Sequence, residues 1–374
     1  MIKKLKVTFM SIAMILTLLT SRPIPIIAES FPPSLPGRLI YHSYNSYGDG
    51  SSELFVYNFK KDQLECISDS WTNVKDPMNA VWASDGKAVV FMGMNTVDPI
   101  WEFYSWDIFY YEIGSIGNPI NLTNDPWARS EDPKIHGDTI IYKAMEQDCN
   151  YIRTISLTDY TINTLYSNPD LEPAMPIYSL DVNTVYISGL AKNGEMDIYS
   201  LPAVGGTAEK VIGCSEPGVF EYYQVPDANG FFYAAHTDSD RVDQIYYKNT
   251  MFGEPVLMPF NIPGCDSADP CVVDQNYTIV SSIRPGGNGG YDLYLCDNLT
   301  GQAVPLSDYN SRINTSKNEL AAWYTPINAG NSSDITEIKK FILNMPCDED
   351  LVGDLNGDGV VDGFDLVYLK RELS

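Results

Sequence analysis

The chain has 374 residues and three histidines, and its 49 acidic against 24 basic side chains give a formal net charge of −25 at pH 7. So negative a chain is not attracted to nucleic acid or to an anionic membrane surface, and its copies repel one another. The acidic residues are spread along the whole sequence, so they mark no local site.

The N-terminal 28 residues have the pattern of a secretory signal peptide. Three lysines lie among the first six residues, residues 7–19 form an apolar stretch too short to span a bilayer, and Ala28 ends a cleavage site. Cleavage removes four cations and no acid, which moves the net charge from −25 to −29. We therefore expect a secreted, extracellular protein with residues 29–36 as a linker. An uncleaved N-terminal anchor is the alternative.

Residues 37–326 repeat a unit of roughly 40–55 residues, the range of propeller blades. Each unit opens with an acidic residue or a proline, passes through a turn into an apolar strand, and continues with an alternating strand of the Asp-Ile-Tyr type. The units open at Asp76, Asp132, Glu172, Glu221 and Asp269. Val, Ile and Tyr alternate with polar residues between Gly, Asn and Asp turns, which predicts half-buried antiparallel strands.

The first unit lacks its opening strand. Residues 38–42 and 53–58 supply only later strands, whereas residues 312–325 read as the start of another unit. A radial array of sheets closes when a terminal strand joins the first blade, so this mismatch predicts a closed ring. Counting the Asp-Ile-Tyr strands gives six blades, with a double-sheet sandwich as the alternative.

One repeat carries the segment Ser84-Asp85-Gly86 before an apolar strand. This segment resembles the repeat of the TolB-like propeller family. The resemblance implies a mainly β fold with a six-bladed β-propeller over residues 37–326.

The repeats carry little sign of catalysis. There is no G-x-S-x-G or H-E-x-x-H motif. Oligogalacturonate lyases are similar propellers that hold a metal with several histidines, and here His42 and His236 end apolar strands at similar blade positions, with His136 in a turn. A three-histidine metal site is one interpretation, and ordinary polar histidines are the other.

An insertion at residues 98–106 places Trp101 and Trp106 beside carboxylates. Aromatic faces next to carboxylates can stack on sugar rings and accept hydroxyl hydrogen bonds, so we predict both tryptophans as carbohydrate-binding. Burial at a blade edge is the alternative.

The glycine-rich segment 284–290 joins two strands and does not open a helix, which predicts a hairpin loop rather than a phosphate cradle.

Seven cysteines are present. Cys265 and Cys271 are near enough in sequence to close a small disulfide loop, and an odd count leaves at least one free thiol. Mostly buried single cysteines are the alternative.

The last 22 residues contain a twelve-residue calcium loop. A hard divalent cation needs six to eight converging oxygens, and a glycine at position 6, here Gly359, permits the sharp turn. Asp closes the loop where an EF-hand has Glu. The predicted Ca²⁺ ligands at positions 1, 3, 5, 7, 9 and 12 are Asp354, Asn356, Asp358, the carbonyl of Val360, Asp362 and Asp365. A turn that binds nothing is the alternative.

The stretch D-L-N-G-D-G-V-V-D-G-F-D-L-V-Y-L-K-R resembles a type I dockerin repeat. Residues 334–342 align with residues 365–373 as a second helix, but the loop before them has Trp323 and Ile327 at ligand positions. The resemblance therefore implies a small α-helical dockerin-like module over residues 327–374, with one intact and one degenerate repeat. It also implies binding to a cohesin domain of a scaffoldin through four residues. These are Gly363, Phe364, Lys370 and Arg371.

Together these features predict a secreted, cellulosome-type component. The calcium-binding module would dock the propeller onto a scaffoldin, and the propeller would bind carbohydrate or protein during polysaccharide degradation. The alternative is that the propeller is itself a hydrolase or lyase acting on pectic or hemicellulosic substrates. A third possibility is that the module folds back onto its own propeller.

Overall fold

The structure is a computed structural model that describes residues 31–96, 106–147, 149–249 and 253–326. The chain divides into two compact units, residues 1–33 and 34–374. All the strands in the described residues belong to the second unit. Within the same residues, no helix is both long and apolar enough to cross a membrane.

Six four-stranded antiparallel sheets make up the described part of this unit. We number them as blades 1 to 6. Blade 1 contains β24 (Asn318–Thr325), β1 (Arg38–Tyr44), β2 (Glu53–Asn58) and β3 (Gln63–Cys66). Blade 2 contains β4 (Val74–Trp82), β5 (Ala88–Asn95), β6 (Trp106–Glu112) and β7 (Ile120–Asn121). Blade 3 contains β8 (Ala128–His136), β9 (Thr139–Glu146), β10 (Cys149–Ser156) and β11 (Ile162–Ser167).

The remaining three blades repeat this order. Blade 4 contains β12 (Leu171–Tyr178), β13 (Thr184–Ala191), β14 (Met196–Pro202) and β15 (Glu209–Lys210). Blade 5 contains β16 (Val219–Pro226), β17 (Gly230–Thr237), β18 (Gln244–Asn249) and β19 (Val256–Leu257). Blade 6 contains β20 (Ser267–Val272), β21 (Tyr277–Ser282), β22 (Asp292–Asp297) and β23 (Ala303–Pro305), followed by the short 3-10 helix η2 (Leu306–Asp308).

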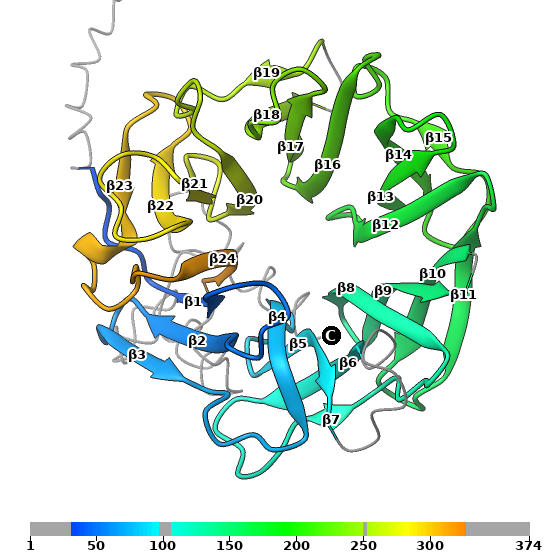
Figure 1. Cartoon of the computed structure of the whole chain (residues 1–374), viewed down its shortest axis with the longest axis horizontal. Coiled ribbons are helices and arrows are strands. Elements are labelled where there is room, and N and C mark those ends of the chain that lie inside the picture. Colours follow the sequence, from blue (N-terminus) through cyan, green and yellow to red (C-terminus); the bar gives the residue numbers. More distant parts are fainter. Residues whose placement is uncertain (1–30, 97–105, 148, 250–252, 327–374) are drawn as a thin grey trace, which may run out of the picture. The chain divides into compact units, whose positions relative to one another are not determined.

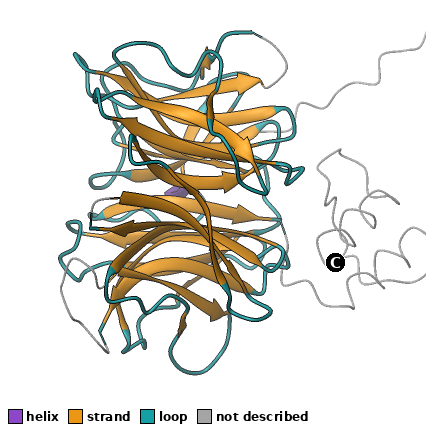
Figure 2. Cartoon of the chain, turned by 90° about the vertical axis from the view of Figure 1, so that its right-hand side faces the viewer, coloured by secondary structure: helices purple, strands orange, loops and turns teal. Residues whose placement is uncertain are grey.

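The blades stand around a central axis, with β24, β4, β8, β12, β16 and β20 innermost (Figure 1). Strands and loops make up almost all of the described chain (Figure 2). We call the face at which the innermost strands begin the front face, and the face at which they end the back face. The predicted six-bladed β-propeller is confirmed, and the sandwich alternative is wrong.

The hydrophobic core lies between neighbouring blades. One apolar cluster joins Leu54 of blade 1 to Phe91 and Phe109 of blade 2, and equivalent clusters join blades 2 and 3, 3 and 4, 4 and 5, and 5 and 6. The third strand of most blades contributes one fully buried aliphatic residue after a polar one, which explains the Asp-Ile-Tyr repeat. These aliphatic residues are Leu54, Ile108, Ile198, Ile245 and Leu293, each 0% exposed.

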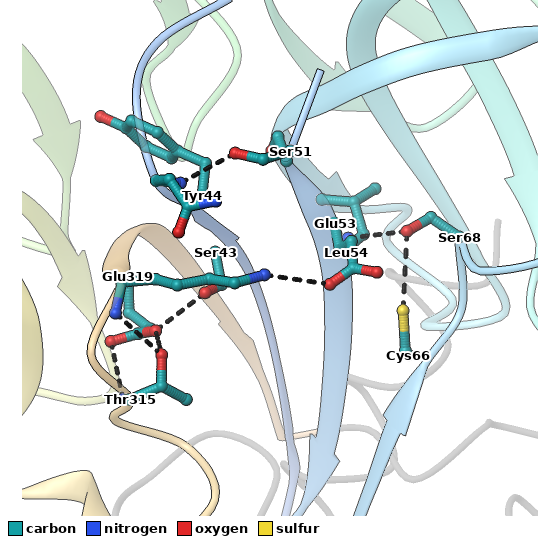
Figure 3. A network of polar contacts seen from close by, with 12 residues as sticks. Ser43, Tyr44, Ser51, Glu53, Leu54, Cys66, Ser68, Thr315 and Glu319 are labelled. Carbon is teal, nitrogen blue, oxygen red and sulfur yellow. Dashed lines mark hydrogen bonds and ion pairs between the residues drawn. The ribbon is translucent and has the colours of Figure 1, made fainter. Parts of the chain in front are cut away.

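The ring closes through blade 1, as the missing opening strand predicts. The last strand, β24, pairs antiparallel with β1, from Arg38 opposite Thr325 to Tyr44 opposite Asn318. A buried carboxylate reinforces this pairing, because Glu319 accepts hydrogen bonds from the hydroxyls of Ser43 at 2.8 Å and Thr315 at 2.7 Å (Figure 3). The two ends of the propeller are thus held by both backbone and side-chain hydrogen bonds.

Cysteines play no cross-linking role in the described residues. All six that the structure describes are free, so the expected loop between Cys265 and Cys271 is absent. Burial raises the pKa of the Cys271 thiol to about 12. Cys214, Cys271 and Cys296 are buried and behave as small apolar side chains, so half of the described cysteines match the alternative that the sequence left open.

Candidate functional site

Each innermost strand carries a β-bulge with a left-handed residue facing the axis region. In β4, β8, β12, β16, β20 and β24 the register with the next strand shifts at this point. Bulges re-aim side chains and are common near functional sites, and non-glycine residues with positive φ are rare. The six residues have φ between 47° and 54°; they are Asn79, Asp132, Met175, Tyr223, Asp269 and Ala321.

The bulges surround an axial cavity. Its volume is about 450 Å³, which includes space open to solvent, and all six innermost strands contribute to its wall. Its lining combines apolar groups with a lysine, a carboxylate and a phenol. The lining residues are Asn79, Ala80, Val81, Lys134, Met175, Tyr223, Gln224, Val225, Asp269, Pro270, Ala321, Ala322 and Trp323.

Polar groups at this cavity bond across blade boundaries. The Asn79 amide donates to Oδ1 of Asp132 at 2.8 Å, and the backbone N–H of Ala321 donates to Oδ2 of Asp269 at 3.2 Å. Lys134, which comes from the blade opposite Asp269, places its ammonium 5.2 Å from the ring centroid of Trp323. Blades 3, 6 and 1 therefore contribute charge and an aromatic ring to one cavity.

Burial dominates the electrostatics of the axial cavity. It raises the pKa of Asp269 to about 6, although the hydrogen bond from the backbone N–H of Ala321 lowers that pKa. Burial also raises the pKa of Asp132, helped by the neighbouring carboxylate of Glu131, and lowers the pKa of Lys134 although both aspartates oppose that shift. Charged groups with perturbed pKa values in a cavity are typical of functional sites.

Of the two tryptophans predicted to bind sugar, only Trp106 lies among the residues that the structure describes, and it is buried. Trp106 begins β6 and is 2% exposed, with the ring of Tyr47 stacked on it at 5.8 Å between centroids. The guanidinium of Arg129 lies 5.0 Å from the same ring. Trp101, the other predicted residue, lies outside the described residues. Sugar binding by this pair stays a prediction, and the exposed ring at this place is Tyr47.

The three histidines are far apart in the blade order. His42 lies in β1 of blade 1, where burial lowers its pKa to about 3 and its Nδ1 accepts a long hydrogen bond from the backbone of Asn79 at 3.4 Å. His236 in β17 pairs through Nδ1 with Asp243 at 2.7 Å, and His136 is exposed at the end of β8. No group of three or more His, Cys, Asp or Glu side chains in the described ranges is arranged to hold a metal ion.

The glycine-rich loop between β21 and β22 holds a carboxylate of the chain itself. Asp292 Oδ2 accepts hydrogen bonds from the backbone N–H groups of Asn288 at 2.8 Å and Gly289 at 3.3 Å. A Cβ added at Gly287 would lie 2.0 Å from the same oxygen, so a larger residue there would displace the Asp292 carboxylate. The segment is the predicted connection between two strands, and the N–H groups of Asn288, Gly289 and Gly290 bond within the chain.

The remaining predicted site residues lie outside the described residues. They are the calcium ligands Asp354, Asn356, Asp358, Val360, Asp362 and Asp365 and the cohesin-contacting Gly363, Phe364, Lys370 and Arg371.

Sequence reasoning missed the axial cavity, although part of its signal is visible. Asp132-Pro133 and Asp269-Pro270 are the openings of two repeats. A residue before proline is pushed away from right-handed helical backbone, and Asp tolerates the left-handed region better than most residues do. Met175 also precedes a proline, Pro176, but methionine lacks the left-handed tolerance of Asp, and no comparable pattern marks Tyr223 or Ala321.

No protein-family profile and no curated protein match the chain. Solved structures do. TolB from Acinetobacter baumannii matches with a TM-score of 0.58 and 14% identity, over 78% of this chain and 67% of that one. A Kuenenia stuttgartiensis hydrazine synthase matches with a TM-score of 0.59 and 10% identity, over 77% of this chain but only 46% of that one. An oligogalacturonate lyase from Vibrio parahaemolyticus matches at 0.46 with 12% identity, over 72% of this chain and 79% of that one, too distant to bear on substrate. At such identities the likeness concerns the fold alone: the described chain forms a six-bladed, TolB-like β-propeller.

Proposed function

We propose that this protein is a secreted component of an extracellular polysaccharide-degrading assembly of the cellulosome type. In this proposal a calcium-binding dockerin-like module at residues 327–374 docks the propeller onto a cohesin domain of a scaffoldin. The propeller acts as a binding module for carbohydrate or protein. The observation that carries the proposal is the loop sequence from Asp354 to Asp365, which has an oxygen ligand or a glycine at every position where a calcium loop needs one.

Calcium would couple folding of the module to docking. The loop brings four acidic side chains into a short segment, and their mutual repulsion opposes loop closure until a cation neutralises it. The helix that follows carries Lys370 and Arg371, so ordering the loop would also fix the pair that the family uses on cohesin.

Calorimetric titration of calcium into the mature protein tests this proposal. We expect one site with a dissociation constant of about 10⁻⁶ M or lower. The double variant Asp354→Ala, Asp365→Ala should lose it. The matched control is Asp69→Ala, Asp238→Ala, which removes the same charge from exposed positions of the propeller and should bind calcium normally. Equal calcium binding in both double variants would contradict the proposal.

Docking is tested by capture on immobilised cohesins of several types, with and without a calcium chelator. Calcium-dependent capture of the unmodified chain supports attachment to a scaffoldin. Calcium binding without capture by any cohesin would instead favour a module that folds back onto its own propeller.

A second candidate function is hydrolysis or lyase cleavage of a polysaccharide by the propeller. The observation that favours it is Asp269, whose pKa of about 6 is near that of a general acid or base working at neutral pH, in a cavity shared with Lys134. Release of soluble products from pectic or hemicellulosic substrates separates this candidate from a binding module, which releases none.

A further inference from the structure

An exposed tyrosine lies on the front face, where elements of three blades meet. Tyr47 belongs to the loop between β1 and β2 of blade 1 and is 58% exposed. Its ring lies nearly parallel to Trp106 of blade 2, at an interplanar angle of 5°. Because one ring face is against Trp106, the exposed surface belongs to the opposite face and the ring edge.

A chain of charged contacts holds this ring in place. Arg129 of β8 in blade 3 donates from Nη2 to the Tyr47 hydroxyl at 2.8 Å and from Nε to Glu131 at 2.6 Å. Lys143 of β9 pairs with the other oxygen of Glu131 at 2.8 Å. The side chains of Arg129 and Glu131 are only 12% and 11% exposed. Ordering a side chain before its ligand arrives reduces the entropy lost on binding.

A second exposed tyrosine shows what is particular about Tyr47. Tyr160 is 57% exposed in the turn between β10 and β11, which lies on the back face. Within the described ranges its ring has no stacking partner and its side chain makes no hydrogen bond. Both tyrosines therefore have an exposed ring, but only the Tyr47 ring is held in place by a stacking partner and a hydrogen bond.

We infer that Tyr47 is a stacking platform for a neutral pyranose unit with equatorial hydroxyls in a polysaccharide, which rests on the carbohydrate-binding role proposed above. A pyranose whose hydroxyls are equatorial presents C–H groups on both faces, and such apolar faces pack against an aromatic ring. A polyuronate is the poorer fit, because the nearby cation Arg129 is already paired with Glu131 and the chain as a whole has a net charge of −25.

Calorimetry with cellohexaose and with hexagalacturonate, at one salt concentration, tests the inference on the full chain. We expect the unmodified chain to bind cellohexaose in preference to hexagalacturonate. Tyr47→Ala should weaken binding about fivefold to tenfold, the usual worth of an aromatic contact. Tyr47→Phe, which keeps the ring and loses the Arg129 contact, should weaken binding less than Tyr47→Ala does. Tyr160→Ala should bind as the unmodified chain does.

Three results would overturn the inference: preference for hexagalacturonate, equal weakening by Tyr47→Ala and Tyr160→Ala, or no cellohexaose binding by the unmodified chain. Thermal unfolding of each variant checks that the propeller stays folded. Calcium-dependent cohesin capture, measured on the same samples, should be the same in all of them. Capture without saccharide binding would reject the platform and leave docking standing, whereas saccharide binding without capture would reject docking and leave the platform.

Discussion

At the residue scale, burial decides which carboxyl groups keep a proton. Glu221 begins the repeat of blade 5 and is 2% exposed, and its Oε2 has no hydrogen-bond partner among the described residues. Burial, and then the neighbouring carboxylate of Asp197, raise the pKa of Glu221 to about 8. Asp197 itself is paired with Lys210 at 2.6 Å. With its pKa at about 8, Glu221 is therefore mostly protonated at neutral pH.

This shift makes stability depend on pH in a defined direction. The pKa of Glu221 is higher in the folded chain than its ordinary value of 4.5, so the stabilisation from its bound proton is complete below about pH 4.5 and is lost as the pH rises through about 8. Glu221→Gln is uncharged at every pH. We expect its free energy of unfolding to exceed that of the unmodified chain by about 1–3 kcal/mol at pH 9, with the difference vanishing near pH 4.5.

Urea unfolding between pH 4.5 and 9 measures this difference. Glu209→Gln, at an exposed position of β15, serves as the control and should track the unmodified chain throughout. A constant offset between Glu221→Gln and the unmodified chain at all pH values would show that the proton of Glu221 has no part in the effect.

At the element scale, the six bulges impose backbone conformations that most side chains disfavour. Ala321 in β24 has φ 47°, whereas the next residue, Ala322, is buried at 3% exposure and is not among the residues with positive φ. The left-handed region costs a residue with a Cβ about 1–2 kcal/mol, and a glycine avoids this cost while losing more chain entropy on folding.

These two adjacent alanines provide a matched test of the bulge. Ala321→Gly should leave stability unchanged or raise it by up to about 1 kcal/mol, because relief of the left-handed backbone offsets the entropy loss. Ala322→Gly gains no such relief and should lower stability by about 1–2 kcal/mol. Chemical denaturation of both variants checks the order, and a larger loss in Ala321→Gly would contradict the bulge at that position.

The strands and blades can be predicted from the sequence, whereas the contacts between blades cannot. Polar-apolar alternation and the Asp-Pro and Asp-Ile-Tyr repeats are enough to predict six blades and their openings, because strand period and turn chemistry are local properties. Stacking of Tyr47 on Trp106 joins residues of two blades, and Arg129 comes from a third. Such contacts depend on how the blades pack, so the sequence pattern alone leaves sugar contact and burial of Trp106 as alternatives, and the structure has the ring buried.

At the scale of the whole molecule, one strand from the far end of the propeller completes the ring. A chain ending at residue 326 keeps β24, whereas a chain ending at residue 317 leaves β1 paired with β2 alone and opens its other edge. An open strand edge pairs with other chains. We expect the longer chain to be monomeric and to unfold cooperatively, and the shorter chain to associate or to melt at least about 10 °C lower.

Light scattering after size-exclusion chromatography and thermal melting compare the two chains. A further truncation to residue 322 removes part of β24 and should give an intermediate result. Equal melting temperatures for the chains ending at 317 and 326 would mean that β24 does not hold the ring together.

Closure through β24 also means that blade 1 is the last blade to be completed during synthesis of the chain. Synthesis runs from the N-terminus, so β1 emerges about 280 residues before its partner, and the pairing of Arg38 with Thr325 is among the longest-range contacts of the propeller. Until β24 is translated, blade 1 has an unpaired inner edge next to blades that have already formed. Such an edge is a target for aggregation, so we expect blade 1 to stay open to wrong pairing for longer than any other blade.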